Sequence, residues 1–387
     1  MSVSLVLDLV AAAQSALAVR SYGRMLLGAA GDPIVSPPAS AASRPGSVTI
    51  VVPVLDERAR LGPCLDGLVQ QDATVREILV VDGGSRDGTQ ALVRAAVARD
   101  ARLRLVDAGA PPDGWNGKAW NLQTGLTQSA AESSWILTID ADVRPAPDLA
   151  RALVAHAERS WLEAFSAAPL QIVEDAALAA LHPALLATLV YRCGLPGRAA
   201  SRPEAVQANG QCTFVQRELL RETRAIELAK ASPCEDFTIA RAIVRAGTPF
   251  GFFEAPLLAS VEMYASAADC LANWPRSLLL RDAESRDSLV RLGLLEVALV
   301  QTLPLLLAVA LGATGRRGTA AFRVNALLAL ARLGVLAGTR RAYGAVPGSY
   351  WLSPLADLAA LFALARELRR PTTTWRGRAL ARELPAA

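Results

Sequence analysis

Short apolar runs alternate with helical segments between residues 48 and 140, and this alternation constrains the fold more than any other feature. The runs "VTIVVPV", "EILVVD", "RLRLVDA" and "SWILTID" have the length and composition of buried strands. The intervening segments 61–71, 87–100 and 117–130 are predicted to be helices. Strands that alternate with helices predict an α/β fold with a mostly parallel sheet covered on both faces.

Acidic residues stand at the ends of three of these strands. Glu57 follows the first strand, Asp82 ends the second before Gly83, and Asp140 and Asp142 follow the fourth. Ligands of such sheets bind beyond the carboxyl ends of the strands. Carboxylates gathered there repel one another unless a cation or a ligand offsets their charge. A hard divalent cation, which prefers oxygen ligands, would do so.

The composition excludes several classes of protein. Hydrophobic residues make up 52% and charged residues 20% of the 387 residues, which excludes a disordered chain. The net charge is only +4 and the arginines are dispersed, so we expect no nucleic-acid partner. The five cysteines form no CxxC pair, which argues against a zinc site or a disulfide framework. His156 and His182 are the only histidines, so a histidine base has few candidates.

Apolar segments flank this region on both sides. Residues 3–19 precede Arg20 and Arg24 and predict either a membrane anchor with cytoplasmic arginines or an interfacial helix. Three further apolar segments indicate membrane association, with a soluble helical subdomain as the alternative, and the number of crossings stays open: 292–313, 320–338 and 350–365. The expected domains are an anchor (1–24), a linker (25–46), a catalytic domain (47–286), C-terminal membrane helices (287–370) and a basic tail (371–387).

Five motifs occur in the order typical of one enzyme family. They are "VVPVLDER", "VVDGGSRDGT", "GKAWNLQTGL", "IDAD" and "CEDFTIARAIVRAG", and over residues 47–284 the chain resembles the family-2 glycosyltransferases. The stretch "PPDGWNGKAWNLQTG" resembles the branch associated with hopanoid and carotenoid glycosylation. The resemblance implies a Rossmann-like, A-type glycosyltransferase domain between an N-terminal anchor and C-terminal membrane helices. We expect it at the cell (inner) membrane, with the catalytic domain facing the cytoplasm.

The resemblance also implies a reaction and a set of roles. An inverting, metal-dependent enzyme would move a sugar from a nucleotide-sugar donor, expected to be a UDP-sugar, to a lipid or isoprenoid-type hydroxyl. Asp236 matches the family's catalytic base, which takes the proton of the acceptor hydroxyl. Asp142 matches the ligand of Mg²⁺ or Mn²⁺, and Asp140 matches a contact to ribose or metal. Asp82 matches the acceptor of the uracil N3–H, and Glu57 would lie beside the base and ribose.

Other residues are predicted with an ordinary alternative beside each. Lys118 is expected near the donor diphosphate, or else is a solvated lysine at a helix start. Glu235 belongs to the acceptor side, or only to an acidic first helical turn. Trp274 and Arg276 close the site, or lie on an amphipathic helix at the membrane surface. Two more positions complete the expected site, on the donor and acceptor sides respectively: Pro53 and Gly210.

Three features of the chain bear on competing functions. The family usually has a second aspartate where Gly83 stands, which leaves Asp82 alone for the base contact. The Q-x-x-R-W motif of processive members is absent from the sequence, which argues against a polysaccharide synthase. A sugar nucleotidyltransferase would need a phosphate loop rich in glycine and arginine after the first strand. The segment "VVPVLDER" stands there and contains no such loop. A non-catalytic membrane scaffold would have no need for Asp140, Asp142 and Asp236.

Overall fold

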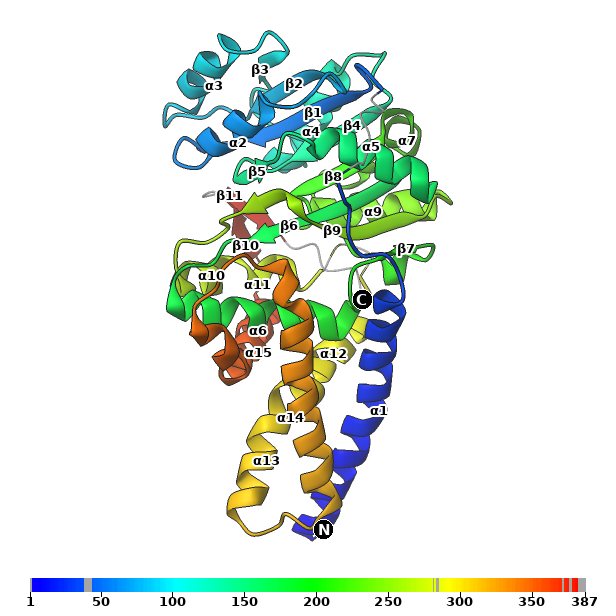
Figure 1. Ribbon diagram of the computed structural model, residues 1–387, viewed down its shortest axis with the longest axis vertical. Helices are drawn as coiled ribbons and strands as arrows, with labels where there is room; N and C mark the ends of the chain where they lie inside the picture. Colours follow the sequence, from blue (N-terminus) through cyan, green and yellow to red (C-terminus); the bar gives the residue numbers. More distant parts are fainter. Residues whose placement is uncertain are drawn as a thin grey trace.

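A single mixed sheet forms one end of an elongated molecule (Figure 1). The computed structural model describes residues 2–37, 44–280, 282, 285–370, 372–375 and 378–381. The sheet strands are β1 (Val48–Val54), β2 (Val75–Asp82), β3 (Leu103–Asp107), β4 (Trp135–Ile139), β5 (Val143–Pro145), β6 (Ala164–Gln171), β7 (Arg198–Ala200), β8 (Cys212–Gln216) and β9 (Phe250–Val261). Their order is β3-β2-β1-β4-β8-β6-β9-β5, and β7 pairs with β9.

The first four strands are parallel, as predicted from the alternation. The crossover helices α2 (Leu61–Leu68), α3 (Thr89–Val97) and α4 (Gly117–Gln128) join them and require this direction. β8 instead pairs antiparallel with both β4 and β6, and α6, β7 and η1 lie between β6 and β8 in the chain. The sheet is therefore mixed, with a parallel half that carries the predicted motifs.

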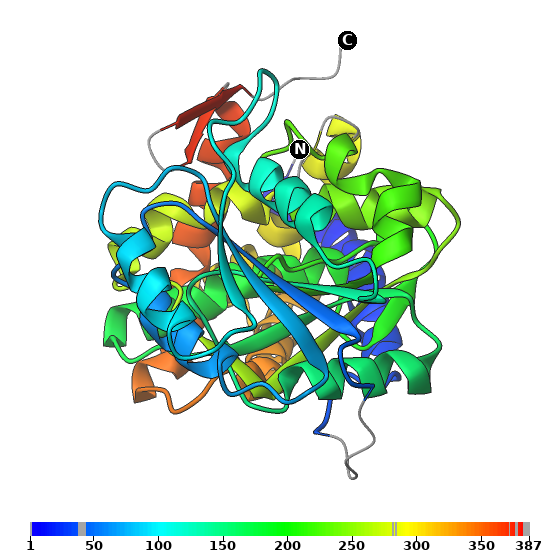
Figure 2. The ribbon, with the colours of Figure 1, turned by 90° about the horizontal axis from the view of Figure 1, so that it is seen from above.

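Strand alternation divides the core into two layers. Ile50 and Val52 of β1 pack in one cluster with helices α2, α3 and α5 (Leu149–Ser160). Val51 points to the other face, into a cluster formed by α4, α7 (Arg217–Thr223), α8 (Ala225–Leu228) and α9 (Glu235–Arg245). Both faces of the sheet are thus covered by helices, as Figure 2 shows from above.

A helical layer lies below the sheet and continues into long helices. It contains α6 (Ala176–Cys193), α10 (Ala267–Asn273), α11 (Pro275–Leu278), α12 (Asp287–Glu296), the π-helical η2 (Val297–Thr302) and α15 (Asp357–Arg369). From it α1 (Val3–Ala29), α13 (Leu303–Ala313) and α14 (Ala320–Thr339) extend side by side away from the sheet (Figure 1). Short 3₁₀ segments complete it: η1 (Pro203–Ala205), η3 (Arg340–Ala342) and η4 (Gly348–Ala356).

Four helical segments are long and apolar enough to cross a membrane: 3–29, 176–193, 287–313 and 320–342. The second of these, α6, was not predicted from the sequence as an apolar segment. The segment expected at 350–365 begins instead as the 3₁₀ segment η4 and continues as α15. Within the expected basic tail, β10 (Thr372–Trp375) and β11 (Arg378–Ala381) pair antiparallel, and the rest of that tail lies outside the described residues.

Polar side chains in these apolar helices are paired with one another. Glu296 of α12 forms ion pairs with Arg20 and Arg24 of α1, at 2.9 and 2.8 Å. Arg332 of α14 is buried and pairs with Asp357 of α15 at 2.9 Å. Buried charges are tolerated where they are paired and hydrogen-bonded, so these contacts fix how the helices meet.

Candidate active site

A cavity of about 700 Å³ lies at the carboxyl ends of the parallel strands and reaches down to α6. It is lined by side chains from the strand ends, from the start of α4, from α9 and from α10 and α11. Ten of the eleven residues predicted from the sequence line it: Pro53, Glu57, Lys118, Asp140, Asp142, Gly210, Glu235, Asp236, Trp274 and Arg276. The structure therefore brings together residues separated by more than two hundred positions in the chain.

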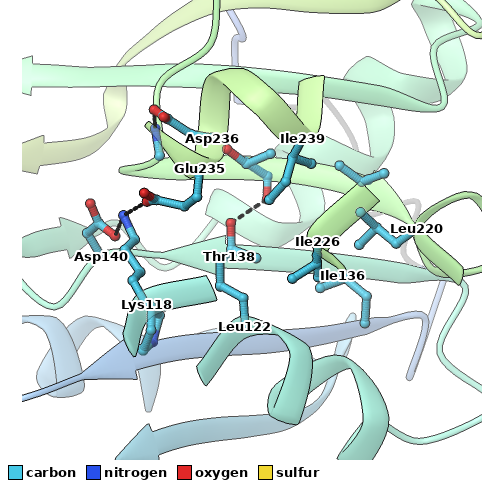
Figure 3. Close-up of a pocket in the computed structure, with 14 residues that line it drawn as sticks. Lys118, Leu122, Ile136, Thr138, Asp140, Leu220, Ile226, Glu235, Asp236 and Ile239 are labelled. Carbon is cyan, nitrogen blue, oxygen red and sulfur yellow. Dashed lines mark hydrogen bonds and ion pairs between the residues drawn. The ribbon is translucent and has the colours of Figure 1, made fainter. Parts of the chain in front are cut away.

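Lys118 joins two acidic segments at the centre of the site. Its Nζ lies 2.8 Å from a carboxylate oxygen of Asp140 and 2.8 Å from one of Glu235 (Figure 3). Burial alone would lower the pKa of Lys118, but Asp140, Glu235 and Asp236 together raise it well above its ordinary value. Lys118 therefore carries a positive charge in a fixed position. It is not the solvated lysine that the sequence analysis gave as the alternative.

Asn116 fixes the start of the helix that carries Lys118, and the sequence analysis missed it. Its side-chain oxygen accepts from the backbone N–H of Ala119 at 2.7 Å, which caps α4. Its side-chain nitrogen donates to the carbonyl of Ser232 at 2.8 Å. Since Ser232 lies just before α9, Asn116 ties the Lys118 segment to the Asp236 segment. An asparagine directly before a predicted helix was the signal that could have identified it.

Asp236 is held by backbone groups. One of its carboxylate oxygens accepts from the N–H of Gly210 at 2.7 Å, and the other accepts from the N–H of Phe237 at 2.8 Å. A Cβ at Gly210 would lie 3.1 Å from Nζ of Lys118 and 3.3 Å from Asp236, so only glycine fits here without displacing its neighbours. Asp236 is thus oriented without a direct ion pair to Lys118 among the contacts described.

Three aspartates of the site have raised pKa values. Burial, followed by the charge of Glu235, raises the pKa of Asp236 to about 6. Burial also raises the pKa of Asp140 to about 6, although Lys118 partly opposes this and Asp142 adds to it. The pKa of Asp142 is raised by burial as well, against the effect of Arg60. Burial is the largest cause of all three shifts, and the neighbouring carboxylates add to it.

Asp82 is the one predicted site residue that does not line the cavity. Its buried carboxylate accepts hydrogen bonds from the backbone and hydroxyl of Ser85 and, at 2.6 Å, from the side chain of Gln90. It borders a separate surface depression with Arg94 and Arg104. Asp82 therefore lies apart from the other strand-end acids, because its own loop folds over the carboxylate, and its contact to the uracil base stays a prediction.

Asn121 of α4 lies beside the ends of β1 and β2 and lines the cavity there, whereas Asp82 does not. Its side-chain nitrogen donates to the carbonyls of Val54 and Val81, each at 3.1 Å, while its buried oxygen has no hydrogen-bond partner in the described part of the chain. Asn121 lines the cavity, and a Cβ on Gly83 would lie only 3.2 Å from it. The glycine that departs from the family pattern thus leaves room for this asparagine.

Residues 49–222 match the family model described as glycosyl transferase family 2. This part of the chain is a family-2 glycosyltransferase domain. The resemblance predicted from the motifs is confirmed for it. The match ends before Asp236, so the role of that residue remains a prediction.

The glycosyltransferase domain has curated relatives in Staphylococcus aureus. Over 98 residues the chain is 35% identical to a protein named 4,4'-diaponeurosporenoate glycosyltransferase from strain bovine RF122 / ET3-1, and 34% identical to that of strain MRSA252. The match covers 25% of this chain and 24% of each relative, so it spans about a quarter of their length.

A solved structure shares the fold of the glycosyltransferase domain and its helices. It is the mannosyltransferase PcManGT from Pyrobaculum calidifontis in complex with GDP-Man and Mn²⁺. The likeness covers 93% of this chain and 99% of that one, with a TM-score of 0.53 and 21% sequence identity. The A-type glycosyltransferase fold expected from the motifs is thereby confirmed.

The oxygen donors of the site fit a divalent cation that binds together with a diphosphate. Asp140 and Asp142 line the cavity together, two residues apart in the chain, and both offer carboxylate oxygens to it. Among the described residues, however, no three acidic, histidine or cysteine side chains converge closely enough to enclose a metal. Mg²⁺ is commonly held by one or two carboxylates together with substrate phosphates. Asp140 and Asp142 fit a cation held by two carboxylates and the donor diphosphate.

Proposed function

We propose that the chain is an inverting, metal-dependent glycosyltransferase that moves a sugar from a nucleotide-sugar donor, a UDP-sugar, to the hydroxyl of a lipid or isoprenoid-type acceptor. The observation that carries the proposal is the position of Asp236. Its carboxylate is oriented by two backbone N–H groups and lines the same cavity as Asp140 and Asp142. Inverting transfer requires a base for the acceptor hydroxyl. It also requires positive charge at the leaving diphosphate, which a cation held by the two carboxylates would supply.

The proposed reaction assigns each group a step. The acceptor oxygen attacks C1 of the sugar, the bond from C1 to the diphosphate oxygen breaks, and Asp236 takes the acceptor proton. Lys118 and Arg60 lie where their positive charge would stabilise the diphosphate. Mg²⁺ or Mn²⁺, bound by Asp142 with Asp140, would neutralise the charge on the leaving group.

A lipid acceptor at a membrane is supported by three observations. The Staphylococcus aureus relatives are named for transfer to 4,4'-diaponeurosporenoate, which favours an apolar acceptor. Four helices have the length and composition of membrane spans. Arg20, Arg24, Arg340 and Arg341 stand near the catalytic-side ends of α1 and α14, against Arg316, Arg317 and Arg323 at the opposite end, and this small excess favours a cytoplasmic catalytic domain at the inner membrane.

The test is UDP release from UDP-sugars by the full-length protein in detergent, with a lipid extract as acceptor source. We expect release that depends on Mg²⁺ or Mn²⁺, that EDTA abolishes, and that Asp142→Asn lowers by about a hundredfold, because the leaving group loses its charge stabilisation. Asp66→Asn, which changes an exposed surface carboxylate, serves as the control and should keep full activity. Undiminished turnover in EDTA would contradict the metal assignment.

A further inference from the structure

The cavity that contains the carboxylates continues to an apolar wall on α6. Leu186, Leu189 and Val190 of this helix line it, together with Leu278 of α11. The wall lies on the side of the sheet from which α1, α13 and α14 extend (Figure 1). One cavity thus combines a charged half, suited to a nucleotide diphosphate, with an apolar half that no part of the donor needs.

His182 stands in this apolar half with one ring nitrogen unused. The side chain lines the cavity and is 1% exposed. Its Nδ1 lies 2.8 Å from the hydroxyl oxygen of Tyr343, whereas its Nε2 is buried with no hydrogen-bond partner among the described residues. Buried polar atoms in folded proteins nearly always have a partner, so an orphaned one in a cavity wall is free to bind a polar group of a ligand or a water molecule.

The neighbours of His182 fix its ring in place. The ring of Trp274 lies 4.2 Å from it, centroid to centroid, at an interplanar angle of 31°. Tyr343 meets it edge to face at 5.5 Å. Either tautomer is compatible with the Tyr343 contact, and Nε2 is then a donor in one and an acceptor in the other. A hydroxyl, which both donates and accepts, suits Nε2 in both cases.

The other histidine of the chain lacks these features. His156 is also buried, at 3% exposed, but it does not line the cavity. Its Nε2 lies 3.5 Å from the hydroxyl of Ser160, and its ring packs against Phe165 and Phe253 in the core of the sheet. His156 is therefore an ordinary core histidine and a matched control.

We propose that α6 and His182 form the acceptor subsite of the enzyme. The apolar chain of an alcohol lies along Leu186, Leu189 and Val190, and a second hydroxyl of the same molecule, distinct from the one that reacts at Asp236, hydrogen-bonds to Nε2 of His182. This inference rests on the proposed function and goes further. It assigns His182 as the residue that recognises an acceptor whose apolar chain carries a hydroxyl and that discriminates against a hydrocarbon without one. His182 is a binding residue here and takes no part in proton transfer.

The test uses photoaffinity labelling of the full-length protein in detergent with UDP and Mg²⁺. The probes are an isoprenoid diol bearing a diazirine, called the alcohol below, and the matching diazirine hydrocarbon without hydroxyls. In the wild type the alcohol should label peptides of α6. At limiting probe concentration His182→Phe should lower labelling by the alcohol about tenfold, as expected for losing one buried hydrogen bond, and leave labelling by the hydrocarbon unchanged.

Two further variants separate recognition from folding. His182→Gln keeps an amide group near the position of Nε2 and should restore part of the labelling. His156→Gln should leave labelling by both probes unchanged. UDP binding, measured on every variant, should equal that of the wild type, because the charged half of the cavity is untouched.

Equal labelling of wild type and His182→Phe by the alcohol would overturn the role of His182. Labelling confined to the outer faces of α1, α13 and α14 would overturn the subsite as a whole. The proposed function fails separately: if the alcohol labels α6 through His182 yet no sugar is transferred to any lipid alcohol, the subsite stands and the proposed transfer does not.

Discussion

Asp236 is oriented by the N–H groups of Gly210 and Phe237, and an asparagine of nearly the same shape keeps one of these two hydrogen bonds through its amide oxygen. We expect Asp236→Asn to bind UDP with nearly unchanged affinity, because the donor contacts are made by other residues. Turnover should fall by roughly a hundredfold or more, the effect of losing a positioned proton acceptor. Isothermal titration with UDP and a turnover assay would measure the two effects. Weakened UDP binding with normal turnover at saturation would place the base elsewhere.

The raised pKa of Asp236 predicts the acid limb of the rate profile. A base acts only in its ionised form, so activity should fall as the pH drops through about 6, the pKa that burial and Glu235 give this carboxyl. An unperturbed aspartate would lose activity only near pH 4. The pH dependence of kcat at saturating donor, metal and acceptor measures it. A profile flat down to pH 4 would contradict either the burial of Asp236 or its role.

At the scale of elements, the start of α4 carries a prediction about Asn116. Asn116→Ala removes the cap of the helix and its bond to Ser232, which should lower the free energy of unfolding by about 1 kcal/mol. Because Lys118 stands two residues later, turnover should fall as well. Thr319→Ala removes the cap of α14 far from the site and is the matched control. It should show a similar loss of stability with normal turnover, measured by thermal unfolding and UDP release.

For the whole molecule, the long apolar helices predict integral membrane association. Leu327, Leu330 and Leu333 are exposed on α14, as expected for side chains in contact with lipid. The full chain should sediment with membranes and resist carbonate extraction, and changing these three leucines to lysine should release it or prevent its insertion. Changing Trp161 and Leu228, which are exposed on helix ends beside the sheet and at least about as exposed as these leucines, to lysine should leave the protein in the membrane. Wild-type protein that is monodisperse without detergent would contradict the prediction.

The sequence by itself determined the features that depend on local pattern. Alternation of apolar runs and helical segments predicted the parallel half of the sheet, since the period and length of each run reflect its burial. Acids at strand ends predicted Glu57, Asp140 and Asp142 as lining one site, because parallel strands bring their carboxyl ends to one edge. Asp236 and Gly210 came from the family resemblance instead.

Only the tertiary structure decided what depends on contacts between distant segments. Asp82 follows the same strand-end pattern as Asp140, yet Ser85 and Gln90 take its carboxylate out of the cavity, and no periodicity in the chain encodes that loop contact. The direction of β8 depends on where α6 returns the chain. The orphaned nitrogen of His182 likewise exists only because a helix, an aromatic ring and a distant tyrosine hydroxyl meet around one side chain.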